Sequence, residues 1–191
     1  MSTRHFALFD TAIGVCAIAW TGHGVCGVQL PERDAGATGI RLRRRFPDAV
    51  KTPPDGAIEQ AIDGIVALLR GEARDLTFVG LDMEAIPSFR QSIYAVLRGI
   101  PPGSTRSYGE IATQLGTQVT ARDVGDAMGK NPFPIIVPCH RVVGTGGRIG
   151  GFSANGGVAT KLRLLNIERA EVGTPPALFD SLPLAVRPRR R

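Results

Sequence analysis

The chain has 191 residues, of which 43% are apolar and 21% charged, a composition typical of a soluble globular protein. No apolar run approaches the length of a membrane-spanning helix, and the N-terminus lacks the apolar core of a signal peptide. We therefore expect a cytoplasmic protein with no membrane partner. The net charge of +6 suits a polyanionic partner such as nucleic acid, although many basic soluble proteins bind none.

The three cysteines are too few and too scattered for a disulfide scaffold. Cys16 and Cys26, with His5 and His23, fit no strong spacing of zinc ligands, so both cysteines are expected as small apolar residues on strands. We expect no metal and no other cofactor.

The first half of the chain predicts a small sheet with helices. The runs GVCAIAW and GVCGVQL, separated by TGHG, predict a β-hairpin. The basic segment 39–46 predicts a short helix. Residues 55–71 carry an apolar stripe with helical spacing and predict a stronger helix. Residues 76–83 predict a further strand, and a domain boundary is expected near 84–87.

The second half changes to helices with polar caps. Ser88 and Gln91 have the spacing of a capping box, as do Ser107 and Glu110. Thr120 and Asp123 are expected to cap the next helix. Two short helices joined by a tight turn are typical of a helix-turn-helix, although many such pairs bind no DNA.

These patterns predict an α/β fold of the α+β kind, with a sheet-and-helix domain over 1–85. A mainly helical domain with a helix-turn-helix is expected over 86–170, and its last helix over 158–168. Residues 171–191 are rich in proline and arginine and are expected to form a flexible tail.

Three prolines after Asn131 forbid a continuous helix, so Cys139 is expected on loop-like backbone. A lone cysteine beside one histidine is a poor metal site, which leaves a buried structural thiol or a nucleophile. A nucleophile needs a base, and His140 is the candidate. Adjacent side chains of extended backbone point to opposite sides, so a Cys–His contact requires a turn or a bridging water. Glu168 is a candidate for orienting the histidine. The residues alone leave both alternatives open.

The segment IVPCHRVV, with SYGEIA upstream and TKLRLLNIE downstream, resembles the O6-alkylguanine-DNA alkyltransferase family from about residue 86 to residue 168. The spacings from Tyr108 through Arg122 and Asn131 to Cys139 agree with the family pattern, whereas the N-terminal half matches only loosely. The resemblance implies direct-reversal DNA repair. In that reaction the alkyl group of O6-alkylguanine, or of O4-alkylthymine, passes irreversibly to Cys139, once per molecule.

The resemblance also implies roles for individual residues. Cys139 would accept the alkyl group, and His140, oriented by Glu168, would take the thiol proton through a water. Tyr108 would donate a proton to the guanine, with Lys161 placed near its hydroxyl. Without the resemblance, Lys161 reads as an exposed helix charge. Asn131 would have a structural role in holding the cysteine loop.

Guanine inside a duplex cannot reach such a thiol, so the nucleotide must be flipped out of the stack. The family resemblance implies that the helix-turn-helix binds the minor groove and that Arg122 enters the duplex. Further DNA contacts are expected from Ser107, Thr120 and Ala121. The base pocket is expected to involve Met128, Val142, Phe152 and Ser153. Double-stranded DNA carrying O6-alkylguanine is the expected partner of a monomer, with clustering along DNA left open.

Three positions depart from the family pattern. Asp123 replaces a common alanine, and we expect it to stabilise its helix at a small cost in DNA affinity. Ala154 and Asn155 lengthen the loop over 150–157, which borders the alkyl pocket. Thr21 stands where some members carry a zinc-binding cysteine.

Two alternative functions remain at this stage. One is a protein of the same fold that binds alkylated DNA without transfer, although such relatives replace the acceptor cysteine. The other is a helix-turn-helix transcription regulator, which leaves the Cys-His segment unexplained.

Overall fold

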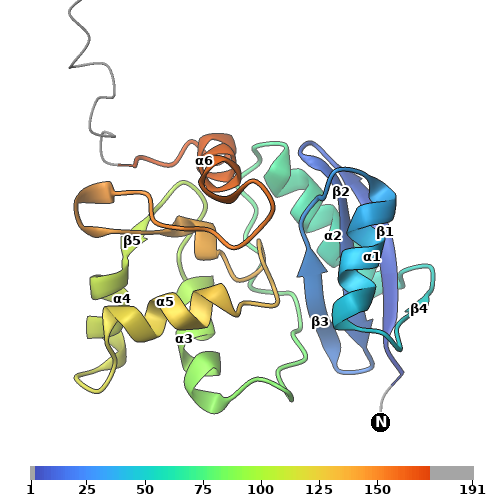
Figure 1. Cartoon of the computed structure of the whole chain (residues 1–191), viewed down its shortest axis with the longest axis horizontal. Coiled ribbons are helices and arrows are strands. Elements are labelled where there is room, and N and C mark those ends of the chain that lie inside the picture. The colour runs from blue at the N-terminus through green and yellow to red at the C-terminus, as the bar shows by residue number, and fades with distance from the viewer. Residues whose placement is uncertain (1–2, 173–191) are drawn as a thin grey trace, which may run out of the picture.

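The computed structural model describes residues 3–172, so most of the tail expected over 171–191 lies outside the described residues. A sheet with two helices occupies one side of the molecule, and a mainly helical part occupies the other (Figure 1). No described helix is long and apolar enough to cross a membrane.

The sheet has the order β3-β2-β1-β4, formed by β1 (His5–Thr11), β2 (Gly14–Thr21), β3 (Gly24–Gln29) and β4 (Val50–Lys51). The first three strands pair antiparallel, and the short β4 runs parallel to β1. The predicted hairpin is confirmed as β2 and β3. The sequence reading overlooked β1, although its alternating burial is the period-two pattern of a strand.

Helices α1 (Ala35–Arg45) and α2 (Gly56–Leu69) cover the sheet, and both were predicted, α1 with a later start. Alternate side chains of β2 divide between them. Ala17 and Ala19 pack in one apolar cluster with Leu42 of α1, while Ile18 and Trp20 join the cluster that contains the α2 side chains. The two faces of one strand thus hold the two layers together.

The strand predicted over 76–83 is wrong. This segment forms turns, and only Leu81 makes an isolated bridge, to Val25 of β3. The Val25 N–H donates to the carbonyl of Gly80 over 2.9 Å, and its carbonyl accepts from the N–H of Asp82 over 2.8 Å. The apolar run at 76–81 instead packs its side chains onto the core, with Leu76 and Val79 buried.

Helix α3 (Ser88–Arg98) begins the second half, but the capping box predicted at Ser88 is wrong. Pro87 occupies the N-cap position, and no side chain caps the helix there. The Gln91 amide donates instead to the carbonyls of Met83 and Ile86, over 3.1 and 2.8 Å. Gln91 therefore holds the segment that links the two halves rather than its own helix end.

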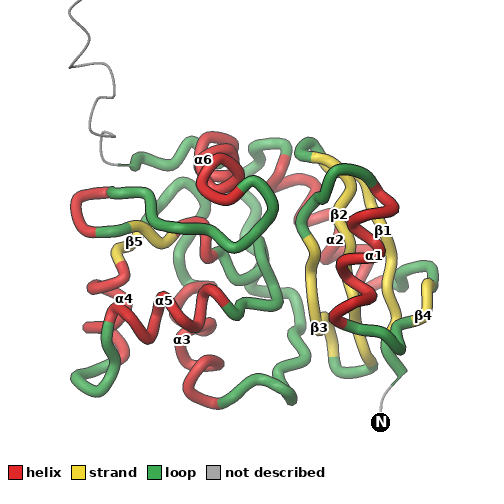
Figure 2. The backbone as a smooth tube through the Cα atoms, in the orientation of Figure 1, coloured by secondary structure: helices red, strands yellow, loops and turns green. Residues whose placement is uncertain are grey.

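The helix-turn-helix consists of α4 (Tyr108–Leu115) and α5 (Ala121–Gly129), which cross in Figure 2. Both predicted capping boxes are confirmed, Ser107 with Glu110 and Thr120 with Asp123. The two-residue strand β5 (Arg106–Ser107) lies parallel to β6 (Val142–Val143). This pairing brings the start of α4 beside the segment that follows Cys139.

The last helix, α6 (Gly157–Ile167), confirms the one predicted over 158–168. One continuous apolar cluster includes strand residues of the sheet, α2, and residues of the second half such as Ile93, Tyr94 and Phe133. The Val28 N–H of β3 also donates to the carbonyl of Pro132 over 2.8 Å. The sheet therefore supports the loop that carries Cys139.

Candidate active site

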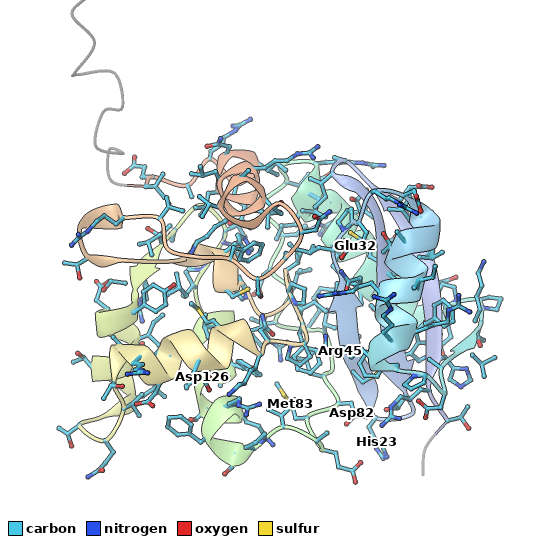
Figure 3. All side chains as sticks on the ribbon, viewed as in Figure 1. His23, Glu32, Arg45, Asp82, Met83 and Asp126 are labelled. Atoms are coloured by element: carbon cyan, nitrogen blue, oxygen red, sulfur yellow. The ribbon has the colours of Figure 1, made fainter. Side chains whose placement is uncertain are left out.

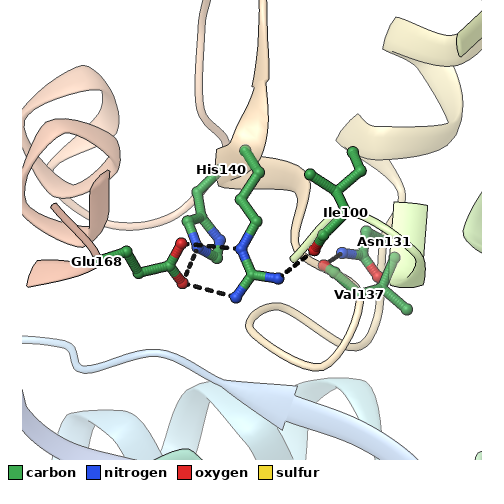
Figure 4. Close-up of polar contacts among 6 residues, drawn as sticks. Ile100, Asn131, Val137, His140 and Glu168 are labelled. Atoms are coloured by element: carbon green, nitrogen blue, oxygen red, sulfur yellow. Dashed lines mark hydrogen bonds and ion pairs between the residues drawn. The ribbon is translucent and has the colours of Figure 1, made fainter. Parts of the chain in front are cut away.

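Asn131 clamps the loop that leads to Cys139. Its Nδ2 donates to the carbonyl of Val137 over 2.8 Å, and its Oδ1 accepts from the N–H of Phe133 over 2.9 Å (Figure 4). Between these contacts Ile135 has a φ of +76°, which a β-branched residue rarely adopts. Ile135 is almost fully buried, so packing and the Asn131 clamp hold the strained backbone in place.

Cys139 lies at the start of a 3-10 turn, Cys139–Arg141, rather than on extended backbone. Pro138 precedes the turn, and the Cys139 side chain is buried at 7% exposure. Because successive residues of such a turn point in different directions, the thiol and the His140 ring face different surroundings.

His140, Arg141 and Glu168 form a buried charged network behind the cysteine (Figure 4). His140 Nε2 lies 2.9 Å from Glu168 Oε1, and Arg141 donates to both carboxylate oxygens over 2.7 and 2.8 Å. Arg141 also donates to the carbonyl of Ile100 over 2.6 Å. The side chains of His140 and Glu168 are 0% and 2% exposed. The expected orientation of His140 by Glu168 is thus present as a direct hydrogen bond.

The network determines which nitrogen of His140 carries the proton. Burial by itself would raise the pKa of Glu168, but the hydrogen bonds and charges of His140 and Arg141 outweigh it and lower that pKa to about 2. The carboxylate can therefore only accept, and Nε2 must donate to it. Burial lowers the pKa of His140, so its ring is neutral at pH 7. Nδ1 is then an unprotonated acceptor, and it makes no hydrogen bond within the described residues.

Burial raises the pKa of the Cys139 thiol, while the Asn131 amide and the Lys161 charge act in the opposite direction. Lys161 is fully buried, so the reading of it as an exposed charge is wrong. Its Nζ donates to the carbonyl of Val142 over 2.5 Å. No hydrogen bond joins Lys161 to Tyr108 in the part of the chain that the structure describes, so its expected place near that hydroxyl stays a prediction.

A cavity of about 370 Å³ opens on Cys139 and brings together most of the predicted pocket residues, namely Tyr108, Met128, Phe152 and Ser153. Gly125 also lines it, and a Cβ at that position would lie 3.7 Å from the Tyr108 ring. Burial raises the pKa of Tyr108, which keeps its hydroxyl protonated. Val142 is buried and does not line this cavity, but its carbonyl retains a second lone pair beside the bond from Lys161.

The predicted DNA contacts lie at the starts of α4 and α5. Arg122, Thr120 and Ala121 are exposed, and Ser107 is half-buried with its hydroxyl accepting from the Glu110 N–H. Asp123 caps α5 as expected, because its carboxylate accepts from both the N–H and the hydroxyl of Thr120. The proposed cost of Asp123 in DNA affinity stays a prediction.

The candidate zinc residues are occupied elsewhere. His5 Nδ1 is paired with the Thr52 hydroxyl over 2.9 Å, and its ring stacks on Trp20. Burial raises the pKa of Cys16 to about 12. Thr21 donates to the Asp82 carboxylate over 2.6 Å. Within residues 3–172 no three side chains of the metal-ligating types lie close enough together to hold an ion.

The lengthened loop over 150–157 reaches the N-terminal half. Asn155 Nδ2 donates to the carbonyl of Pro31 over 3.4 Å, and the Asn155 carbonyl accepts from the Thr160 hydroxyl. One of the two added residues therefore bridges the two halves of the molecule.

Arg141 is a site residue that the sequence reading missed as a separate participant. Its signal was its place in the PCHRV segment, but only the fold shows that the guanidinium is buried against Glu168. Three arginines of α1 that face Cys139 across a second cavity were likewise read only as a basic helix.

A helix-turn-helix packed beside a buried Cys-His-Glu arrangement defines a DNA-binding protein with a reactive thiol. Comparison with known proteins agrees. Residues 88–170 match the DNA-binding domain of 6-O-methylguanine DNA methyltransferase. The methylated-DNA--protein-cysteine methyltransferases of Mycobacterium leprae and Mycobacterium tuberculosis are 43% and 37% identical, each aligned over 92% of this chain and 99% of its own length.

Solved structures give the same result. The O6-methylguanine methyltransferase of M. tuberculosis superposes with a TM-score of 0.71 at 35% identity, covering 92% of this chain and 97% of that one. The complex of M. tuberculosis OGT with DNA superposes with a TM-score of 0.70 at 36% identity, over 86% and 92% of the two chains. The chain belongs to the methylated-DNA--protein-cysteine methyltransferase family, whose function is direct-reversal repair. The non-transferring binder and the transcription regulator are not favoured.

Proposed function

We propose that this chain transfers the alkyl group of O6-alkylguanine, and of O4-alkylthymine, from double-stranded DNA to Cys139. The observation that carries the proposal is the His140 ring, whose Nε2 is bound to Glu168 and whose Nδ1 remains an acceptor. Such a histidine can take the thiol proton at neutral pH.

The reaction balances as one displacement. The proton of Cys139 passes through a bridging water to Nδ1 of His140, and the thiolate attacks the carbon bound to O6 of the guanine. The S–C bond forms while the C–O6 bond breaks, and the electron pair stays on the guanine. The Tyr108 hydroxyl, kept protonated by burial, supplies a proton to the leaving base. The product is a thioether, so each molecule reacts once.

The network explains why Cys139 rather than another thiol would react. Burial raises the pKa of Cys16 to about 12 and that of Cys26 to about 11, and neither lies in the cavity with Tyr108. The Cys139 pKa is also raised, but only this thiol lies beside a neutral histidine whose proton acceptor is free. The base compensates for a thiol that is otherwise protonated.

The target base must leave the duplex to enter a cavity of about 370 Å³. We infer that the minor groove meets the starts of α4 and α5 and that Arg122 fills the vacated place. Ser107, Thr120 and Ala121 would contact the backbone. A monomer acting in the cytoplasm, able to cluster along DNA, remains the expected form.

Mass spectrometry after incubation with duplex DNA containing O6-methylguanine tests the proposal. Transfer predicts a gain of about 14 Da, the replacement of S–H by S–CH₃, on the peptide that holds Cys139. Cys139→Ser should abolish the gain, and Cys26→Ser, a matched change at the half-buried thiol, should keep it. Binding of the DNA with no mass change would refute transfer.

A further inference from the structure

Cys139 lies where two cavities meet. Besides the cavity with Tyr108, a second one of about 380 Å³ opens on the same thiol, between the sheet half and the helical half. Both are lined by Met128, Gly129, Phe152 and Ser153. The first cavity accounts for the base, so the second needs its own explanation.

Helix α1 supplies the far wall of this second cavity. Arg41, Arg44 and Arg45 line it from the last turns of the helix, with Glu32 as the acidic residue among the lining side chains. Figure 3 shows Arg45 at the end of α1, on the side that faces the helical half. Asn131, Asn155 and Gln29 add polar groups to the same wall.

Two of the three guanidinium groups have no charged partner. Arg41 lies 4.0 Å from the Glu32 carboxylate, which also accepts from the Gln29 amide. Arg44 and Arg45 make no ion pair or hydrogen bond within residues 3–172, and Arg45 lies over the Phe46 ring at 5.2 Å. The cavity therefore carries uncompensated positive charge within reach of the acceptor sulfur.

Arginines at a helix C-terminus also favour the helix dipole, and Arg43 occupies the same last turn. Arg43 does not line the cavity, however, so it offers the same charge and the same helix position without the same direction. The dipole accounts for a basic last turn but not for the convergence of the other three arginines on one hollow.

We propose that this arginine-lined cavity receives the transferred group and selects O6 adducts whose chain ends in a carboxylate. The proposal rests on transfer to Cys139 as described above. As the S–C bond forms and the C–O6 bond breaks, the rest of the group must lie beside the sulfur, and the guanine keeps to the cavity with Tyr108. Planar guanidinium groups bind carboxylates through paired hydrogen bonds. A terminal carboxylate would thus hold the reacting carbon in place before attack.

The test compares two guanine nucleobases of nearly equal shape, O6-(4-carboxybenzyl)guanine and O6-(4-carbamoylbenzyl)guanine. Free bases contain no phosphate, so any role of the arginines in holding DNA drops out. The readout is the ratio of the two transfer rates to Cys139, measured by mass spectrometry, in which overall changes of reactivity cancel. We expect the wild-type protein to favour the carboxylate and the Arg44→Gln/Arg45→Gln variant to lose at least about fivefold of that ratio, roughly 1 kcal/mol.

Arg43→Gln is the matched control, and its ratio should equal that of the wild type. An unchanged ratio in the double variant, or an equal loss in Arg43→Gln, would overturn the proposal. So would a wild-type protein that repairs O6-methylguanine in DNA but accepts neither nucleobase, since the cavity would then not admit large groups. Failure to take the methyl group from DNA at all would instead refute the proposed function itself.

Discussion

The two halves of the molecule bury different kinds of side chain. Among the described residues, the polar side chains buried in the sheet half are uncharged, Thr21 and Thr38. The helical half buries His140, Arg141 and Lys161, together with the Glu168 carboxylate. Apolar packing is sufficient to hold a sheet between two helices. Burying charge is costly unless every group is paired, so its concentration around Cys139 indicates chemistry rather than stability.

Glu168→Gln should have the largest effect on this contrast. It leaves the Arg141 guanidinium buried against a neutral amide, and breaking a buried pair costs about 3–5 kcal/mol. Urea unfolding measures the loss, and mass spectrometry should show slower transfer per folded molecule. Ile18→Val in the sheet half should cost about 1 kcal/mol and leave the transfer rate unchanged. Equal effects of the two changes on transfer would contradict the division of roles.

Acid should weaken the same network. The folded pKa of Glu168, about 2, lies below its ordinary value of 4.5, so its stabilisation is present above pH 4.5 and is lost as the pH falls toward 2. The full loss is on the order of 3 kcal/mol. Exposed carboxylates with lowered pKa values, such as Asp34 and Glu110, contribute in the same range. The difference in unfolding free energy between wild type and Glu168→Gln isolates the buried group, and it should shrink between pH 5 and pH 3. A constant difference would contradict the assignment.

Arg122→Ala separates base flipping from chemistry. Arg122 is exposed at the start of α5, far from the buried network in its surroundings, so its loss should leave the thiol chemistry intact. Transfer from duplex DNA should slow by about tenfold or more, because about 1.4 kcal/mol of unstacking cost corresponds to that factor. Transfer from a free O6-alkylguanine base should stay the same. Equal losses on both substrates would refute the role in flipping.

Asp123→Ala should have the smallest effect. The variant loses the capping contacts with Thr120, which lowers stability, and removes a negative charge near the DNA, which tightens binding, most visibly at low salt. Thermal unfolding and DNA titration measure the two effects. Lower stability without tighter binding would leave Asp123 as a helix cap alone.

Local patterns predicted those parts of the fold that short-range physics controls. The capping boxes at Ser107 and Thr120 and the stripe of α2 depend on residues three or four apart, and all are present. The errors arose where distant residues compete. Gln91 binds the carbonyls of Met83 and Ile86 instead of capping its helix, and the apolar run at 76–83 pairs through a single bridge to Val25.

By itself, the sequence determined the reactive segment, because the prolines around Cys139 exclude a helix and the order of Tyr108, Arg122, Asn131 and Cys139 carries the family pattern. Only the tertiary structure decided the charge states and neighbours of the site. Arg141 and His140 meet Glu168 from 27 and 28 residues away, and the arginines of α1 meet Cys139 across the interface of the two halves. Hydrogen bonds and desolvation depend on which surfaces are brought together, and spacing along the chain does not encode that.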